Sequence, residues 1–208
     1  MVFSSSDRTR PPGAAGFEST KLVIGGGFGV GKTTLVGSIS EIAPINTDVW
    51  MTAASLGVDR LDPGQEKQTT TVGMDFGRIT FSDQLKLFLF GTPGQPRFWP
   101  MWDDLCRGAQ GALVLVNEKH LDASFGAINY FDLDQDLPWI VAVNRFNGQV
   151  ANSLAEIRAA LRLDPAVPIT DVDARDRASV KAALVMLVQH AIEVSRPAGA
   201  VRGAGRQR

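Results

Sequence analysis

The stretch KLVIGGGFGVGKTT, residues 21–34, decides the expected fold. It opens with a short apolar run, passes through a glycine-rich turn and leads into a segment with helical character. Within it, residues 26–33 match the pattern G-x-x-x-x-G-K-[ST], in which glycines let backbone N–H groups turn toward phosphate oxygens. The start of the following helix adds partial positive charge at the same place. The stretch therefore predicts a binding site for the phosphates of a nucleoside triphosphate.

Two side chains of this loop have expected roles of their own. Lys32 should reach the β- and γ-phosphates, and the hydroxyl group of Thr33 should ligate Mg²⁺. The other members are expected to bind nucleotide through their backbone or by lining the loop. The whole predicted set is Gly26, Gly27, Phe28, Gly29, Val30, Gly31, Lys32, Thr33 and Thr34.

Strand-like and helix-like segments alternate on both sides of this loop. Continuous apolar runs at 113–116 and 139–143 are typical of strands buried on both faces. Residues 72–81 and 85–90 flank a short turn and predict an antiparallel hairpin. We expect an α/β fold, with a mostly parallel six-stranded sheet, one antiparallel strand and helices on both faces. The expected helices are 33–42, 98–107, 153–163 and 178–195, and short strands are expected at 21–25 and 169–172.

Composition sets the domain organisation and excludes several classes of function. The tails, residues 1–16 and 197–208, are rich in Ser, Arg, Pro and Gly and are expected to be disordered, leaving one domain over 17–196. The chain has 21 basic and 22 acidic residues, which argues against binding to nucleic acid. Its single cysteine, Cys106, excludes an internal disulfide. No apolar run looks long enough to span a bilayer, so we expect a cytoplasmic protein.

Two further motifs follow the loop in order. TTTVGMDF, residues 69–76, resembles the first switch region of Ras-like GTPases, and the resemblance implies that Thr71 ligates Mg²⁺ and contacts the γ-phosphate. FGTPGQ, residues 90–95, resembles their second switch region. By that resemblance Gly94 binds the γ-phosphate through its N–H, and Gln95 is the catalytic residue that orients the attacking water.

The second switch motif departs from the family at one position. Gly91 stands where Ras-like GTPases have an aspartate that helps to hold Mg²⁺. The metal could then depend on Thr33, Thr71 and the phosphates. Another carboxylate, Asp48 or Asp75, could also replace the missing one, and the sequence leaves these alternatives open.

The base-reading motif departs as well. AVNRFN, residues 142–147, aligns with the guanine-reading N-K-x-D motif, which implies that Asn144, Arg145 and Asn147 bind the nucleotide. An amide at Asn147 offers one acceptor oxygen and a donor that would face another donor on guanine, so selectivity should fall or shift toward xanthine. Alternatively, another group reads the base. Downstream, the N–H of Ala174 is expected to reach the base oxygen.

Together these segments cover about residues 20–195, and the chain resembles a small GTPase of the Ras-like superfamily. Residues 90–105, 141–146 and 173–177 resemble more specifically the bacterial conservon-type GTPases, and more distantly the gliding-motility polarity GTPases. The resemblance implies Mg²⁺ with GTP or GDP as ligand. It also implies two partners, a Roadblock-fold regulatory protein and a sensor-kinase-like membrane protein, through which the chain could be recruited to the membrane.

The leading hypothesis is a switch in bacterial signalling that hydrolyses GTP slowly and with help from partners. Arg60 and Arg97 are candidates for an internal arginine that stabilises charge in the transition state, although solvated surface arginines would look the same. The alternative is a nucleotide-binding scaffold with degenerate catalysis and weakened guanine selectivity. A P-loop kinase or ATPase would leave Thr71 and Gln95 unexplained. The large apolar residues of 98–102 could form a partner surface or the core side of a helix.

Overall fold

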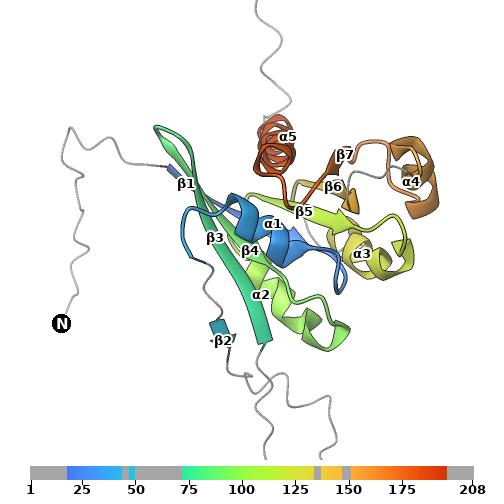
Figure 1. The fold of residues 1–208 in the computed structure, drawn as a ribbon, viewed down its shortest axis with the longest axis horizontal. Helices are drawn as coiled ribbons and strands as arrows, with labels where there is room; N and C mark the ends of the chain where they lie inside the picture. Colours follow the sequence, from blue (N-terminus) through green and yellow to red (C-terminus); the bar gives the residue numbers. More distant parts are fainter. Residues whose placement is uncertain (1–17, 44–46, 50–71, 134–136, 147–150, 196–208) are drawn as a thin grey trace, which may run out of the picture.

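The computed structural model describes residues 18–43, 47–49, 72–133, 137–146 and 151–195. The segments expected to be disordered tails, 1–16 and 197–208, lie outside these residues, so that expectation stays a prediction. Seven strands form one sheet in the order β2-β3-β4-β1-β5-β6-β7 (Figure 1). Their bounds are β1 Glu18–Gly25, β2 Thr47–Val49, β3 Val72–Ser82, β4 Leu85–Gly91, β5 Gly111–Val116, β6 Trp139–Asn144 and β7 Ile169–Val172.

The sheet confirms the expected fold and adds one strand to it. β1 pairs in parallel with β4 and β5, and β5, β6 and β7 continue the parallel pairing. β3 pairs antiparallel with β4 and is the expected antiparallel strand. The seventh strand, β2, pairs antiparallel with β3 at the edge. Its three residues are too few to show a period of two in the sequence.

Helices cover both faces of the sheet. The α-helices are α1 Lys32–Ile39, α2 Trp102–Cys106, α3 Phe125–Leu133, α4 Leu154–Leu161 and α5 Arg177–Ser195. Two 3₁₀ helices precede α2 and α3, namely η1 Pro96–Met101 and η2 Leu121–Ser124. The helix expected at 98–107 is therefore η1 followed by α2, since Pro100 interrupts regular α-helical bonding. η2 and α3 were not predicted.

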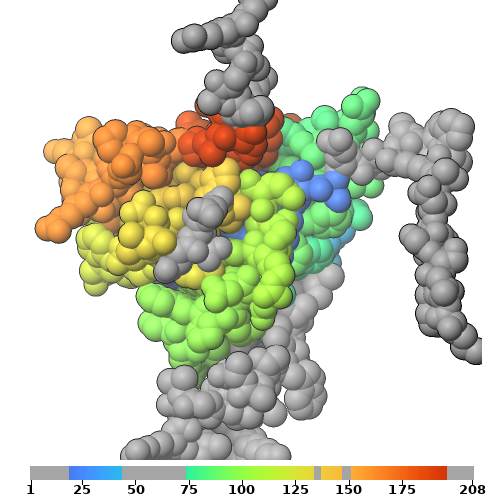
Figure 2. Space-filling view, turned by 180° about the vertical axis from the view of Figure 1, so that it is seen from behind, coloured from blue at the N-terminus to red at the C-terminus, as the bar shows by residue number. Residues whose placement is uncertain are grey.

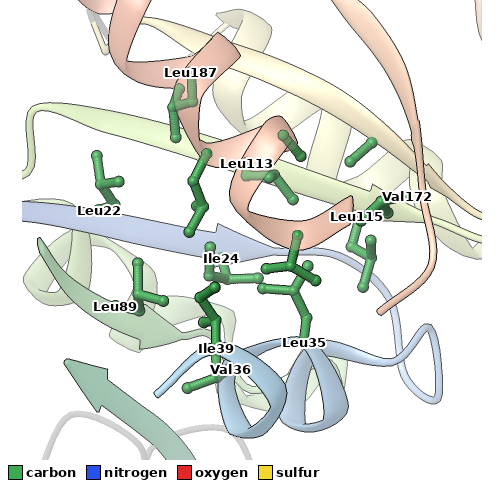
Figure 3. Close-up of a cluster of buried hydrophobic side chains, with 14 of the residues drawn as sticks. Leu22, Ile24, Leu35, Val36, Ile39, Leu89, Leu113, Leu115, Val172 and Leu187 are labelled. Carbon is green, nitrogen blue, oxygen red and sulfur yellow. The ribbon is translucent and has the colours of Figure 1, made fainter. Parts of the chain in front are cut away.

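One core lies between the sheet and the helices α1 and α5. Leu22 and Ile24 of β1 point to the same side of the sheet and pack with Leu35 and Ile39 of α1 and with Leu187 of α5 (Figure 3). The alternate residues of the same strands, such as Val23 and Val114, belong to a second core with side chains from α2, α3 and α4. Atoms of α3 and α4, yellow to orange, form much of the face seen from behind (Figure 2). Burial on both faces explains the continuous apolar runs of β5 and β6.

α5 bears on the expectation that no apolar run of the chain is long enough to span a bilayer. By length and composition alone, Arg177–Ser195 reaches what a bilayer-spanning helix needs, although no single apolar run in it does. The helix lies on the sheet, with contacts to β5, β6, β7 and α1. Val180, Leu184 and Leu187 are buried there, which accounts for part of its apolar character.

The topology also fixes where a ligand can bind. From β1 the chain passes to β3 and β4 on one side, and then returns to β5 on the other side of β1. In open α/β sheets a crevice forms at the carboxyl end of the strands at such a reversal of strand order. The glycine-rich loop, residues 26–31, follows β1 directly and leads into α1, so it lies at this point.

Candidate functional site

The loop between β1 and α1 has the backbone that a phosphate site requires. Gly31 precedes α1 with φ 104°, a value that disfavours residues with a side chain. A Cβ atom at Gly31 would also lie 2.6 Å from Nδ2 of Asn144. α1 begins at Lys32 without a side-chain cap, so an anion at this end of the helix could accept hydrogen bonds from its first N–H groups.

Lys32 is folded back onto the loop. Its side chain is buried, with 8% of the residue exposed, and Nζ donates hydrogen bonds to the carbonyl oxygens of Gly26 (2.8 Å) and Gly27 (2.6 Å). Burial lowers the pKa of Lys32 to about 8, and the negative charge of Asp75 opposes this shift. The buried ammonium group therefore lies where negatively charged phosphate oxygens would stabilise its protonated form.

Thr33 shows which carboxylate stands near the predicted metal site. Its Oγ1 donates a hydrogen bond of 2.9 Å to Oδ2 of Asp75 on β3. Asp75 pairs with Gly91 of β4, and a Cβ atom at Gly91 would lie 2.8 Å from Oδ2 of Asp75. The carboxylate of Asp75 thus occupies the space into which a side chain at position 91 would project. Two carboxylates, Asp48 and Asp75, could replace the missing aspartate. Asp75 lies beside Thr33, whereas the structure does not describe the side chain of Asp48.

The segment after β4 lies against the phosphate loop. A Cβ atom at Gly94 would come 2.8 Å from the carbonyl oxygen of Gly27 and 2.8 Å from Nζ of Lys32. The backbone of Gly94 therefore approaches the loop more closely than any larger residue would allow. Gln95 is next in the chain, and its Oε1 accepts a hydrogen bond of 2.9 Å from Nε of Arg97. Gly94 therefore lies against the phosphate loop, while its binding of the γ-phosphate and the catalytic role of Gln95 stay predictions.

Asn144 joins the phosphate loop to the loop after β7. Its Nδ2 donates to the carbonyl oxygen of Val30 (2.9 Å), and its Oδ1 accepts from the N–H of Ala174 (3.2 Å). The N–H of Ala174 that was expected to reach the base is therefore bonded to Asn144 here. Beside it, hydrogen bonds from Arg175 lower the pKa of Asp173 to about 2, which keeps that carboxyl ionised. Asn144 and Ala174 lie together at one end of the site.

Arg145 makes contacts that the sequence did not suggest. Nε donates to Oδ1 of Asp171 (2.6 Å), Nη1 forms an ion pair with Glu118, and Nη2 donates to the carbonyl oxygen of Asn152 (2.9 Å). These described contacts go to protein groups. The role of Arg145 in nucleotide binding stays a prediction, and Glu118 is a residue of this region that the sequence analysis missed. No spacing in the sequence links Glu118 to Arg145.

Other predicted residues lie at the rim of the site or outside the described part. Phe28 is 75% exposed at the tip of the loop, and Thr34 is exposed in the first turn of α1. Thr71 and Asn147 fall outside the described residues, as does Arg60. Val30 is buried, and Gly29 lies in open space.

The aromatic residues after Gln95 form part of the core. Phe98 and Trp102 are buried, and Nε1 of Trp102 donates to the carbonyl oxygen of Pro93 (3.1 Å). Trp99 is half-buried, and its ring covers Gly126 of α3 so closely that a Cβ atom there would lie 2.0 Å from it. The segment is therefore packed on α3 through Trp99.

The glycine-rich loop after β1, its buried lysine and the sheet order define a P-loop protein with the fold of a G domain. The sequence model of the family described as conserved hypothetical ATP binding proteins matches residues 24–194. The chain therefore belongs to this family.

One solved structure and two curated proteins are similar to the chain. The chain is similar to the G domain of the FeoB iron transporter of T. maritima, with a TM-score of 0.56, 15% identity and coverage of 86% of this chain and 100% of that one. It is 28% identical over 136 residues to the Ras-related protein Rab-18 of Lymnaea stagnalis, covering 61% of this chain and 57% of the relative. It is 33% identical over 109 residues to an uncharacterized protein of Methanocaldococcus jannaschii, covering 52% of this chain and 54% of that protein. The chain thus spans about half the length of the curated relatives it matches.

Proposed function

We propose that the chain is a guanine-nucleotide-binding switch that hydrolyses GTP slowly. The observation that carries the proposal is the close approach of Gly94 to both Gly27 and Lys32. A terminal phosphate bound by the loop would lie next to the backbone of Gly94 and could accept a hydrogen bond from its N–H. The segment after β4 can therefore respond to the loss of that phosphate. The similarity to Rab-18 and to the FeoB G domain supports guanine as the base.

The residues present fit Mg²⁺. Oγ1 of Thr33 and Oδ2 of Asp75 lie 2.9 Å apart beside the phosphate loop, and oxygen atoms of this kind are the ligands that Mg²⁺ prefers. Thr33 would hold the ion directly, Asp75 would hold it directly or through water, and Thr71 is proposed as a third ligand. When bound, Mg²⁺ supplies positive charge to the β- and γ-phosphate oxygens.

The remaining steps belong to side chains of the chain itself. Lys32 exchanges its two carbonyl partners for phosphate oxygens and neutralises their charge. Gln95 orients the attacking water once its Oε1 is released from Arg97. Asn144 keeps the phosphate loop and the Ala174 loop in register, so that base and phosphates are bound in one geometry.

The proposal extends to the setting of the protein. We propose a bacterial signalling GTPase of the conservon type, cytoplasmic, regulated by a Roadblock-fold protein and recruited to the membrane by a sensor-kinase-like partner. The resemblance of residues 90–105 and 141–146 to that group supports this assignment. Co-purification of the chain with each partner, in the GTP-loaded and GDP-loaded states, tests it. Equal binding of the partners in the GTP-loaded and GDP-loaded states would argue against a switch.

A second candidate is a nucleotide-binding scaffold with little hydrolysis. Asn147 in place of an aspartate favours it, as does the description of the family by ATP rather than GTP. The glycine at position 91 is weaker support for a scaffold than the sequence suggested, because the carboxylate of Asp75 on the neighbouring strand occupies the space of the missing aspartate.

Titration calorimetry with GTP, GDP, XTP and ATP, with and without Mg²⁺, tests the proposal. Preference for GTP together with phosphate release would support the switch. Equal binding of all four nucleotides without turnover, even with the partners added, would support the scaffold. Preference for ATP with turnover would overturn both in favour of an ATPase.

A further inference from the structure

Arg97 holds the side chain of Gln95. Nε of Arg97 donates a hydrogen bond of 2.9 Å to Oε1 of Gln95. The guanidinium group also lies over the ring of Phe98, with Cζ 4.7 Å from the ring centroid. Phe98 is buried, so its ring is a fixed surface on which the arginine rests. The amide of Gln95 is therefore bonded to a side chain that is itself held in place.

The backbone around Gln95 is fixed on both sides. Before it, the backbone of Gly94 lies against the phosphate loop, where a Cβ atom would come 2.8 Å from the carbonyl oxygen of Gly27. After it, the N–H of Phe98 donates to the carbonyl oxygen of Gln95 (3.0 Å), and Pro96 at the start of η1 restricts the backbone torsions further. With the backbone anchored, the torsions of the side chain decide whether the Gln95 amide can face a ligand in the loop.

The oxygen that Arg97 occupies is the one that a water-orienting glutamine needs. A glutamine amide has one acceptor oxygen and one NH₂ donor group. The acceptor is the atom that can receive a hydrogen bond from an attacking water. A hydrogen bond from a positively charged donor is stronger than one from a neutral donor such as water. The bond to Arg97 therefore fixes the direction of the amide oxygen and competes with the attacking water for it.

We propose that Arg97 is a positioning residue that holds Gln95 in a resting orientation and thereby keeps hydrolysis slow. The inference rests on the proposed function and deepens it, because it assigns a regulatory contact to the same site. Hydrolysis then requires Oε1 of Gln95 to exchange Arg97 for water. Arg97 is exposed, so a carboxylate of a partner protein could compete for its guanidinium group and release the amide.

Two other roles for Arg97 predict the opposite change in rate. An arginine that stabilises charge in the transition state accelerates hydrolysis, so its removal would slow phosphate release. An arginine that held Gln95 in its working orientation would also accelerate hydrolysis. An arginine that keeps Gln95 from the water slows hydrolysis, so its removal should accelerate phosphate release. The sign of the change in rate therefore separates the proposed role from the other two.

The experiment measures single-turnover hydrolysis of GTP by the full chain and its variants. Arg97→Met keeps an unbranched side chain beside Phe98 and removes the N–H donors. We expect it to raise the rate constant about fivefold, as the loss of one hydrogen bond that favours the resting orientation would do, and to leave the dissociation constant of GTP nearly unchanged. Arg107→Met makes the same chemical change at an exposed arginine at the end of α2 and should leave the rate unchanged.

A double variant tests whether Arg97 acts through Gln95. In a Gln95→Ala background there is no amide to release, so Arg97→Met should not change the residual rate. Acceleration that persists in this background would overturn the inference. A rate that is lower or unchanged in Arg97→Met alone would overturn it as well.

Urea unfolding shows which variants are folded, and Arg97→Ala carries the same expectation if Arg97→Met does not fold. The result also separates the inference from the proposed function. If Gln95→Ala slows hydrolysis and Arg97→Met does not accelerate it, the inference fails and the proposed function stands. A chain that binds no GTP, or that releases no phosphate in any variant, would overturn the proposed switch and the inference with it.

Discussion

Asp75 on β3 lies opposite Gly91 on β4, and its carboxylate fills the space where a side chain at position 91 would lie. The antiparallel pairing of β3 with β4 creates this relationship, because paired residues project to the same face of a sheet. A carboxylate can therefore reach Thr33 from either strand. This chain carries it on β3.

Asp75→Asn should weaken Mg²⁺-dependent nucleotide binding by about tenfold to a hundredfold, the usual effect of removing a group that supports a metal site. Calorimetry with and without Mg²⁺ measures it, and Asp83→Asn in the exposed turn after β3 is the control. The double variant Asp75→Gly with Gly91→Asp moves the carboxylate to β4 and should recover part of the loss. If Asp75→Asn binds Mg²⁺ and nucleotide normally, Asp75 is not a metal residue.

Nucleotide affinity should fall with rising pH because of Lys32. Its pKa of about 8 in the free protein rises when phosphates bind, since an anion favours the protonated amine. Affinity should be nearly constant below pH 7 and should fall about tenfold between pH 7 and pH 9, as the protonated fraction of the free protein falls. Titrations in buffers of different ionisation enthalpy should show proton uptake at pH 8.5. Lys32→Arg should bind with no such pH dependence.

Gln95→Ala should slow phosphate release by roughly a hundredfold, the low end of what a positioned catalytic side chain contributes, and should leave GTP affinity nearly unchanged. A single-turnover assay with preloaded nucleotide measures the rate. Gln84→Ala, in the exposed turn between β3 and β4, is the matched control. An unchanged rate in Gln95→Ala would remove Gln95 from the catalytic role.

Two glycine-to-alanine changes within helices should have opposite effects on stability. At Gly37 of α1 an added Cβ atom meets nothing within 4 Å, so alanine should raise the free energy of unfolding by about 0.5–1 kcal/mol. At Gly126 of α3 the Cβ atom would lie 2.0 Å from the ring of Trp99, so alanine should lower that free energy by about 1–3 kcal/mol. Urea unfolding measures both. If Gly126→Ala instead raised the free energy of unfolding, the Trp99 ring would be able to move away from α3 at little cost.

Asn147→Asp should raise the preference for GTP over XTP. A carboxylate accepts two hydrogen bonds from guanine, whereas the amide accepts one, so the preference should change by about one to three powers of ten. The ratio of the two dissociation constants measures it. An unchanged ratio would show that another group reads the base.

The sequence by itself determined the parts of the site that are contiguous. The phosphate loop, the strand before it and the helix after it all lie within residues 18–39. The positive φ angles of the glycines and the contacts of Lys32 with the loop depend only on this segment. The parallel sheet followed from the apolar runs of β5 and β6. η2 and α3 were not predicted, although the buried residues of α3, Ala127, Ile128 and Phe131, lie at helical spacing.

Tertiary structure decided the contacts between residues far apart in the chain. Only the register of β3 against β4 selects Asp75 as the carboxylate beside Thr33. Only the order of β5, β6 and β7 brings Glu118, Arg145 and Asp171 together. Local propensity sets neither register nor strand order, since both depend on which faces the whole chain buries. The sequence therefore names the residues that are predicted to bind phosphate, and the fold selects the partners that they contact.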